Sequence, residues 1–202
     1  MGGIELRDDE LVVGRDPNDL DDLAIRFSAV LGELDIDHVY VLGYVVVLAG
    51  RSRATEDIDV LLERLEAEQV DELATRLRDE GFWGPAMPLD SMDEMLADDG
   101  HVWVARDGEM VPRLEVKFVR DEVDRASLEN SLTATIGSDG VELPVGPLEL
   151  QIAYKLFLGS RTDFEDAVHL YALFEETLST DDLRRWVETL GVEEEYDRLT
   201  HV

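Results

Sequence analysis

Two aspartates separated by one apolar residue could hold a metal ion. Asp57 and Asp59 lie in the run EDIDVLL at residues 56–62. Its alternation predicts a strand that points both carboxylates to one face and Ile58 to the other. Ionised carboxylates about 6.5 Å apart repel each other by about 2 to 3 kcal/mol at an effective dielectric constant of about 20, and Mg²⁺ turns that repulsion into attraction. The pair therefore predicts a divalent-metal site, with a solvated acidic strand face as the alternative.

The composition gives that alternative weight. The chain has 48 Asp and Glu among 202 residues against 18 Lys and Arg, a net charge of −30, and only Lys117 and Lys155 are lysines. We interpret this pattern as halophilic adaptation, because at about 1 M salt the Debye length of about 3 Å screens the surface carboxylates from one another. No basic stripe is present to release phosphate counterions, so charge-driven nucleic-acid binding is excluded.

Several other chemistries find no support. The chain has no cysteine, which excludes disulfides, thiolate zinc sites and thiol nucleophiles, and its four histidines lack a metal-ligand spacing. Neither a P-loop nor a Gly-x-Gly-x-x-Gly pattern occurs. The longest apolar run, residues 39–50, is shorter than the roughly 20 residues of a membrane span, and the start does not resemble a signal peptide. We therefore expect a cytoplasmic protein without a membrane partner.

The flanking pattern must supply the scaffold for the aspartates. Asp16-Pro17 predicts a helix start, and residues 44–49 are compatible with strand or helix. The predicted strands are 38–42, 56–62, 101–106, 110–119, 133–136 and 141–145. The other predicted helices are 66–80, 91–98, 148–158, 164–178, 181–190 and a last turn near 196. These elements predict an α/β (α+β) domain with a mixed sheet flanked by helices over residues 1–146, and a C-terminal helical lobe over residues 147–202 packed on it.

A longer motif surrounds the aspartates and resembles a known family. The chain reads Gly43, six residues, Gly50-x-x-Arg53-x-Thr55-x-Asp57-Ile58-Asp59. This is similar to the nucleotidyltransferase superfamily related to DNA polymerase beta, in particular its small minimal and abortive-infection-type members. In that family a strand ends in Gly-Gly or Gly-Ser, a helix follows, and Arg-x-Thr-x-Asp-hydrophobic-Asp enters the next strand.

The resemblance implies roles for these residues. Asp57 and Asp59 would hold Mg²⁺, or Mn²⁺ in its place, while Gly43 and the following helix N-terminus would approach the triphosphate. Arg53 would contact a phosphate, and Thr55 would shape the loop or make a polar contact. Tyr44 stands where the family usually has glycine or serine; its side chain would either crowd the phosphates or stack on a base.

The mechanism of such an enzyme asks for a third carboxylate on a neighbouring strand. In the run LEVKF at residues 114–118, alternation places Glu115 and Lys117 on one face. Glu115 is therefore our candidate for the third metal ligand and catalytic carboxylate, although the family more often has aspartate there. Lys117 would pair with Glu115 or touch a phosphate. An exposed strand face is again the alternative.

The C-terminal helices carry a second part of the resemblance. Lys155 lies in an apolar helix, and the run RTDFEDAVHL follows at residues 161–170. The family has a lysine and then an Arg/Lys-Asp-x-x-Asp run, with a basic residue where this chain has Thr162. The resemblance implies that Lys155 reaches the nucleotide phosphates and that Asp163 and Asp166 orient basic or substrate groups. Helix capping and favourable first-turn charge are the alternative for the two aspartates.

Three functional hypotheses follow. The leading one is a Mg²⁺-dependent nucleotidyltransferase that moves a nucleoside monophosphate from an NTP to an acceptor hydroxyl or phosphate, the acceptor being an RNA end, a protein or a small molecule. The second is a noncatalytic binding module on the same fold, such as a toxin–antitoxin component with a partner protein or a nucleotide sensor. The third is an acidic α/β scaffold whose motif matches are coincidental.

Overall fold

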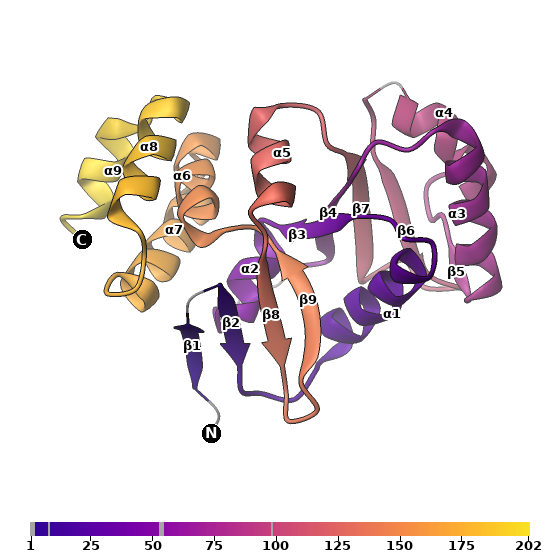
Figure 1. Ribbon diagram of the computed structural model, residues 1–202, viewed down its shortest axis with the longest axis horizontal. Helices are drawn as coiled ribbons and strands as arrows, with labels where there is room; N and C mark the ends of the chain where they lie inside the picture. Colours follow the sequence, from indigo (N-terminus) through magenta and orange to yellow (C-terminus); the bar gives the residue numbers. More distant parts are fainter. Residues whose placement is uncertain (1–2, 8, 53–54, 98) are drawn as a thin grey trace.

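One mixed sheet organises the molecule (Figure 1). The computed structural model describes residues 3–7, 9–52, 55–97 and 99–202. Within these ranges the sheet has the order β1-β2-β8-β9-β3-β4-β7-β6-β5. The strands are β1 (Ile4–Arg7), β2 (Glu10–Val13), β3 (His38–Val41), β4 (Asp57–Leu62), β5 (Phe82–Trp83), β6 (Val102–Arg106), β7 (Arg113–Phe118), β8 (Leu132–Ile136) and β9 (Val141–Val145). The predicted mixed α/β fold class is confirmed.

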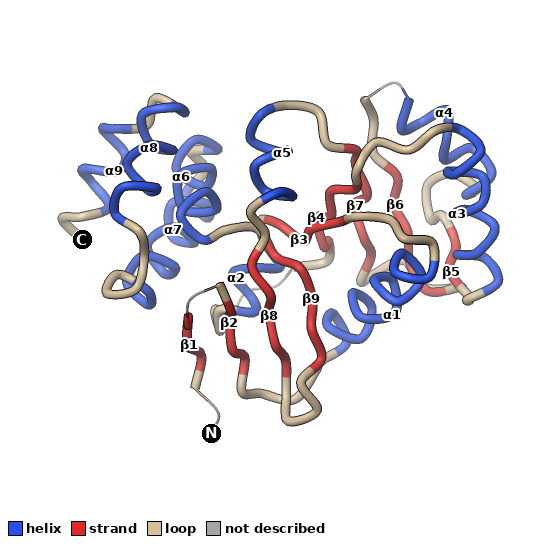
Figure 2. Tube along the Cα trace, in the orientation of Figure 1, coloured by secondary structure: helices blue, strands red, loops and turns tan. Residues whose placement is uncertain are grey.

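Helices flank the sheet and form one end of the molecule (Figure 2). They are α1 (Asp19–Glu33), α2 (Gly43–Leu48), α3 (Ala67–Asp79), a short 3₁₀ turn (Leu89–Ser91), α4 (Met92–Ala97), α5 (Glu122–Glu129), α6 (Leu148–Leu158), α7 (Arg161–Phe174), α8 (Thr180–Leu190) and α9 (Glu193–Leu199). None of the helices in the described ranges has the length and apolarity that crossing a membrane requires.

Strands β3, β4 and β7 lie side by side in the interior of the sheet. β4 pairs antiparallel with β3 and parallel with β7. Ile58, Val60 and Leu62 of β4 are fully buried in the main core, which also contains side chains of α1 and α3. The other face carries a small cluster of Val39, Val41 and Leu61, against which Leu128 of α5 packs. The polar positions of β4 and β7 lie beside that small cluster.

The C-terminal helices share the main core with the sheet. Leu148 and Ile152 of α6 belong to the same buried cluster as the sheet residues. His169 of α7 also places Nε2 2.8 Å from the main-chain oxygen of Ala49, just after α2. Helices α6 to α9 are thereby held against the sheet at one end of the molecule (Figure 1). The domain boundary after residue 146 stays a prediction.

Three local predictions change in the structure. The ambiguous run at residues 44–49 is helical, since α2 spans Gly43–Leu48. Helix α1 starts at Asp19, later than the Asp16-Pro17 signal predicts, because Asn18 and Asp21 form a capping box. Helix α5 has no counterpart among the predicted elements; it begins after Asp121, whose side chain accepts from the Asp124 amide.

His38 at the start of β3 makes stability depend on pH. Its Nε2 lies 2.8 Å from Ser28 Oγ and its Nδ1 lies 3.3 Å from the Ile36 oxygen. Burial lowers the pKa of His38 below its ordinary value of 6.5. The unfolded chain then binds more protons at this site, so the stabilisation from His38 is present above about pH 6.5 and is lost as pH falls through the folded-state pKa.

We expect His38→Gln to lose less stability between pH 8 and pH 5 than the wild type, because glutamine does not take up a proton in this range. Urea unfolding at constant KCl concentration measures both losses. Equal losses of stability in the two proteins would contradict the prediction.

Candidate active site

The three candidate carboxylates lie on adjacent strands. In the parallel pairing of β4 with β7, Asp59 is opposite Glu115 and Asp57 is opposite Arg113. Ile58, between the aspartates, is fully buried, whereas the side chains of Asp57 and Asp59 are 38% and 20% exposed. The alternation read from the sequence therefore holds, and the structure brings Asp59 and Glu115 to one face.

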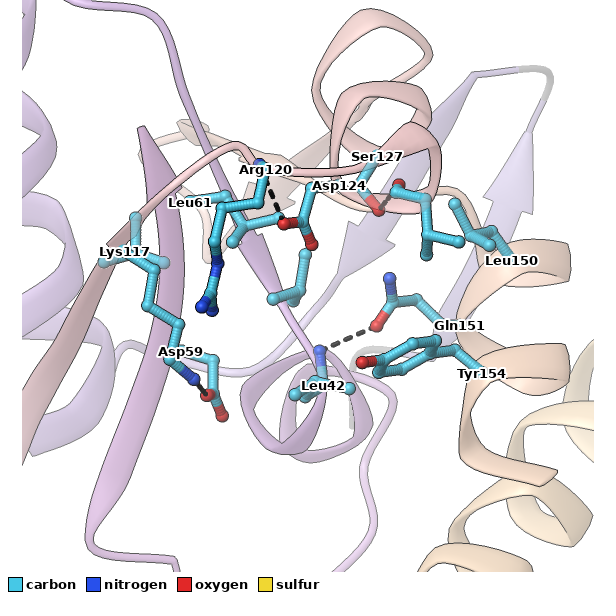
Figure 3. Close-up of a pocket in the computed structure, with 13 residues that line it drawn as sticks. Leu42, Asp59, Leu61, Lys117, Arg120, Asp124, Ser127, Leu150, Gln151 and Tyr154 are labelled. Carbon is cyan, nitrogen blue, oxygen red and sulfur yellow. Dashed lines mark hydrogen bonds and ion pairs between the residues drawn. The ribbon is translucent and has the colours of Figure 1, made fainter. Parts of the chain in front are cut away.

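Lys117 lies between two of the carboxylates. Its Nζ is 2.6 Å from Glu115 Oε1 and 3.4 Å from Asp59 Oδ1, the second contact being drawn in Figure 3. The predicted pairing of Lys117 with Glu115 is present, and Asp59 joins it. Asp59 and Glu115 thus converge on one ammonium group.

Arg113 is the counter-ion of Asp57. Its Nε is 2.6 Å from Asp57 Oδ1, and its guanidinium carbon lies 4.0 Å from the centroid of the Trp103 ring. Both atoms of this ion pair are buried and lack hydrogen-bond geometry. On the other side of Asp57, Thr55 Oγ1 donates to the main-chain oxygen of Asp57 at 3.0 Å, which fixes the entry into β4. Sequence reasoning missed Arg113, although alternation places it on the face of Glu115 and Lys117.

The carboxylates and the lysine shift one another's ionisation. Burial raises the pKa of Asp59, with the charge of Lys117 opposing and that of Glu115 adding to the rise. Burial alone would also raise the pKa of Glu115, but the hydrogen bond and charge of Lys117 bring it below its usual value. The pKa of Lys117 is raised despite its burial, because Glu115 and Asp59 favour the ammonium form. Lys117 is therefore charged at neutral pH.

The donor chemistry of the site suits a hard divalent cation. Three carboxylates provide the oxygen ligands that Mg²⁺ prefers, and Asp57 Oδ1 is buried without a hydrogen bond. Among the described residues, however, no three acidic or imidazole side chains are already gathered as a metal-binding group. The carboxylates are arranged around Lys117 and Arg113, so binding a metal requires at least one of these cations to move.

The turn between β3 and α2 differs from the expectation. The strand ends at Val41 and the helix starts at Gly43, so Leu42 is the single residue between them. Leu42 adopts φ 59° and ψ −121°, a conformation that favours glycine. Its amide donates to Gln151 Oε1 at 2.7 Å. The unusual backbone conformation of this turn thus lies at Leu42, one position before Gly43.

Tyr44 faces the core. It is fully buried, and its hydroxyl donates to Asp21 Oδ1 of α1 at 2.8 Å. Burial and the charge of Asp21 raise the pKa of Tyr44 well above its usual value, so the phenol stays neutral. The structure does not bring Tyr44 to the carboxylates, because the first turn of α2 directs this side chain towards α1. The predicted stacking on a base has no support in this arrangement.

The strained backbone at Leu42 predicts which of two variants at this position is the more stable. Alanine at this position keeps a Cβ in the unfavourable conformation, whereas glycine removes it, so we expect Leu42→Gly to be more stable than Leu42→Ala by about 1 kcal/mol. The same pair of variants at Val47, inside α2, should show the ordinary order with alanine ahead. Thermal and urea unfolding of the four proteins measures both orders. If Leu42→Ala is as stable as Leu42→Gly, the backbone at residue 42 is not strained and the prediction is wrong.

Lys155 forms a largely buried ionic cluster with two aspartates of α7, Asp163 and Asp166. Lys155 Nζ lies 2.7 Å from Asp163 Oδ1 and 3.0 Å from Asp166 Oδ2. Asp166 is fully buried and also lies 2.5 Å from Arg51 Nη1, in the segment between α2 and β4. The positive charge of Lys155 opposes the rise that burial causes in the pKa of Asp59. Arg53 lies outside the described residues.

A cavity opens next to Asp59 and Lys117 (Figure 3). It encloses about 500 Å³ of empty space, including solvent at its mouth, between the sheet, α5 and α6. Gln151, only 2% exposed, uses its Oε1 for the Leu42 amide. The cavity is also lined by Arg120, Asp124, Ser127 and Tyr154, and the sequence analysis identified none of these residues. Of the lining residues that the sequence analysis did not identify, only Gln151 could have been singled out from the sequence, because it is a polar residue within the apolar run of α6.

Comparisons with known proteins identify the fold. No family model matches the chain, and no curated protein matches it by sequence. Among solved structures, the chain is similar to an antigenic nucleotidyltransferase-like protein from Paracoccidioides brasiliensis, with 19% identity, a TM-score of 0.54 and coverage of 86% of this chain and 89% of that one.

The antibiotic-resistance factor ANT(2'')-Ia is also similar. Its solution structure has 17% identity, a TM-score of 0.50 and coverage of 91% of this chain and 97% of that one. Its crystal structure in complex with adenylyl-2''-tobramycin has 16% identity, a TM-score of 0.50 and coverage of 84% and 95%. At these identities the similarity establishes the fold, which is that of the nucleotidyltransferases.

Proposed function

We propose that this chain, which has the nucleotidyltransferase fold, transfers a nucleoside monophosphate from an NTP to an acceptor hydroxyl or phosphate in a reaction that depends on a divalent metal. The observation that carries the proposal is the convergence of Asp59 and Glu115 from facing positions of β4 and β7, with Asp57 on the same strand face. One of these carboxylates, Asp59, lines a cavity together with Lys117 and with Leu42 of the β3–α2 turn.

The proposed reaction uses these residues in distinct ways. Asp57, Asp59 and Glu115 would hold Mg²⁺, or Mn²⁺ in its place, and the bound ion would neutralise charge on the phosphates and acidify the acceptor hydroxyl. The acceptor oxygen forms a bond to the α-phosphorus, and the bond from that phosphorus to the oxygen of the β-phosphate breaks, which releases pyrophosphate. Glu115 would take up the proton of the acceptor hydroxyl. Its lowered pKa keeps it ionised and ready to accept a hydrogen bond from that hydroxyl.

The basic residues would handle the phosphates and the scaffold. Gly43 and Arg53 remain our candidates for phosphate contacts, and Thr55 holds the start of β4 through its bond to Asp57. Lys155 is shared between Asp163 and Asp166. We therefore assign Lys155 first to fixing α6 and α7 beside the site, with a phosphate contact as the further role that the family resemblance implies.

The noncatalytic alternative also has an observation in its favour. Arg113 and Lys117 already balance charge at the candidate carboxylates, and Leu42 replaces a glycine-type position. A module that binds a nucleotide or a partner protein without turnover could keep such an arrangement. Turnover therefore has to be measured directly.

Pyrophosphate release distinguishes the two. The purified chain would be incubated in molar KCl with each NTP and Mg²⁺ or Mn²⁺, together with a panel of acceptors that includes RNA ends, proteins and small hydroxyl compounds such as aminoglycosides. We expect metal-dependent pyrophosphate release and a labelled acceptor with at least one pair. Saturable NTP binding without release across the panel would favour the binding module, and absence of metal-dependent NTP binding would reject both.

A further inference from the structure

Lys117 is a cation built into the proposed metal site. It is one of two lysines in a chain with 48 acidic residues, and it extends from β7 on the strand face of Glu115. Its ammonium contacts Glu115 at 2.6 Å and Asp59 at 3.4 Å. The group lies where the oxygens of both carboxylates converge, the region that a divalent ion bound to both would need.

The second cation of the site is held differently. Arg113 lies with its guanidinium over the Trp103 ring at 4.0 Å, so packing holds it in place while it pairs with Asp57. No comparable ring contact is recorded for Lys117 within the described residues, and its ammonium sits on a flexible four-carbon stem. Of the two cations, Lys117 is therefore the one that can leave at the lower cost.

The cavity next to β4 provides space for the Lys117 ammonium to move. The cavity next to β4 is lined by Lys117 itself and by Asp59, and across it lie Asp124 of α5 and Tyr154 of α6 (Figure 3). The Lys117 side chain runs along the cavity wall with its ammonium at Asp59. The cavity is thus adjacent to the ammonium, and we expect a change of rotamer to carry this group away from the two carboxylates and into the cavity.

We propose that Lys117 competes with the divalent cation for Asp59 and Glu115, so that the chain binds metal weakly until a nucleotide takes up the displaced ammonium. The inference rests on the proposed function and assigns this lysine a positioning role that couples metal binding to nucleotide binding. With Lys117 in place, the three carboxylates face the two positive charges of Lys117 and Arg113, which leaves little net negative charge to attract an ion. The triphosphate of a nucleotide carries more negative charge than either carboxylate and offers the ammonium several acceptor oxygens, so nucleotide and metal favour each other's binding.

The test measures metal binding directly and needs no turnover. Mn²⁺ would be titrated into the full chain by electron paramagnetic resonance and calorimetry at one fixed KCl concentration, with and without a non-hydrolysable NTP analogue. We expect Lys117→Met to bind Mn²⁺ about tenfold more tightly than the wild type without nucleotide. We also expect the analogue to tighten Mn²⁺ binding in the wild type and to have a smaller effect in the variant.

Two further variants control for charge and folding. Arg125→Met removes one positive charge from an exposed position on α5 and should leave Mn²⁺ affinity within twofold of the wild type. Lys117→Arg keeps a cation and should retain weak Mn²⁺ binding. Thermal unfolding in EDTA and in Mn²⁺ shows whether Lys117→Met is folded, and we expect Mn²⁺ to stabilise it more than the wild type.

The outcomes separate this inference from the proposed function. Equal or weaker Mn²⁺ binding by Lys117→Met, or no detectable Mn²⁺ binding by either protein, would overturn the competition. If pyrophosphate release by the wild type still depends on Asp59 while Lys117→Met binds Mn²⁺ no more tightly, the inference alone fails. Loss of both metal-dependent release and metal binding would instead reject the proposed function.

Discussion

Asp59→Asn is expected to reduce metal-dependent pyrophosphate release by at least about a thousandfold, which corresponds to about 4 kcal/mol of transition-state stabilisation. Asparagine keeps the size of the side chain but removes the charge that would hold the ion. Asp57→Asn should have a similar effect. Both rates would be measured with the best NTP and acceptor pair at saturating Mg²⁺.

Stability provides the control for that loss of activity. Burial raises the pKa of Asp59, so the folded chain holds this carboxylate ionised at a cost. Asp59→Asn should therefore stay folded, with a stability near that of the wild type. Asp71→Asn, on the exposed surface of α3, removes the same charge and should leave the rate unchanged. A full rate for Asp59→Asn would reject the metal-site assignment.

Asp166→Ala is expected to cause the largest loss of stability among the variants considered, about 3 kcal/mol. Asp166 is fully buried and pairs with both Lys155 and Arg51. Removing it leaves the almost fully buried Lys155 and the partly buried Arg51 each with one carboxylate partner fewer. Urea unfolding in molar KCl measures the loss.

Glu165 is the matched control for this cluster. It lies next to Asp166 in α7 and also contacts Arg51, at 2.9 Å, but its side chain is 45% exposed. Since exposed ion pairs contribute about 0 to 1 kcal/mol, Glu165→Ala should cost less than about 1 kcal/mol. Similar losses for the two variants would show that the cluster around Asp166 is not the structural tie that we describe.

The positions of the key side chains differ in how far the sequence predicts them. The orientation of Asp57 and Asp59 is local, because two-residue alternation within one strand decides it. The sequence also indicates that Lys155 lies near Asp163 and Asp166, because the helices that carry them are consecutive in the chain. The pairing of Lys155 with both aspartates depends on the packing of α6 against α7, and the link from Asp166 to Arg51 depends on the contact of α7 with the segment after α2.

Tyr44 shows where local reasoning stops. An apolar run such as residues 44–49 fits a strand or a buried helix equally well. In the structure it is α2, which packs against β3, β4 and α7, and its Tyr44 hydroxyl reaches Asp21 of α1. The same folding event places the glycine-type conformation at Leu42.

The amino-acid sequence by itself determined the acidic character and the strand faces of the candidate carboxylates, because composition and periodicity are properties of short segments. The nucleotidyltransferase fold came instead from the resemblance of the motif at residues 43–59 to that family. Only the tertiary structure decided that Asp59 meets Glu115 around Lys117, that Asp57 pairs with Arg113, and that α5 and α6 enclose a cavity beside them. These contacts join segments far apart in the chain. Their register is set by the burial of the whole sheet, which no short segment specifies.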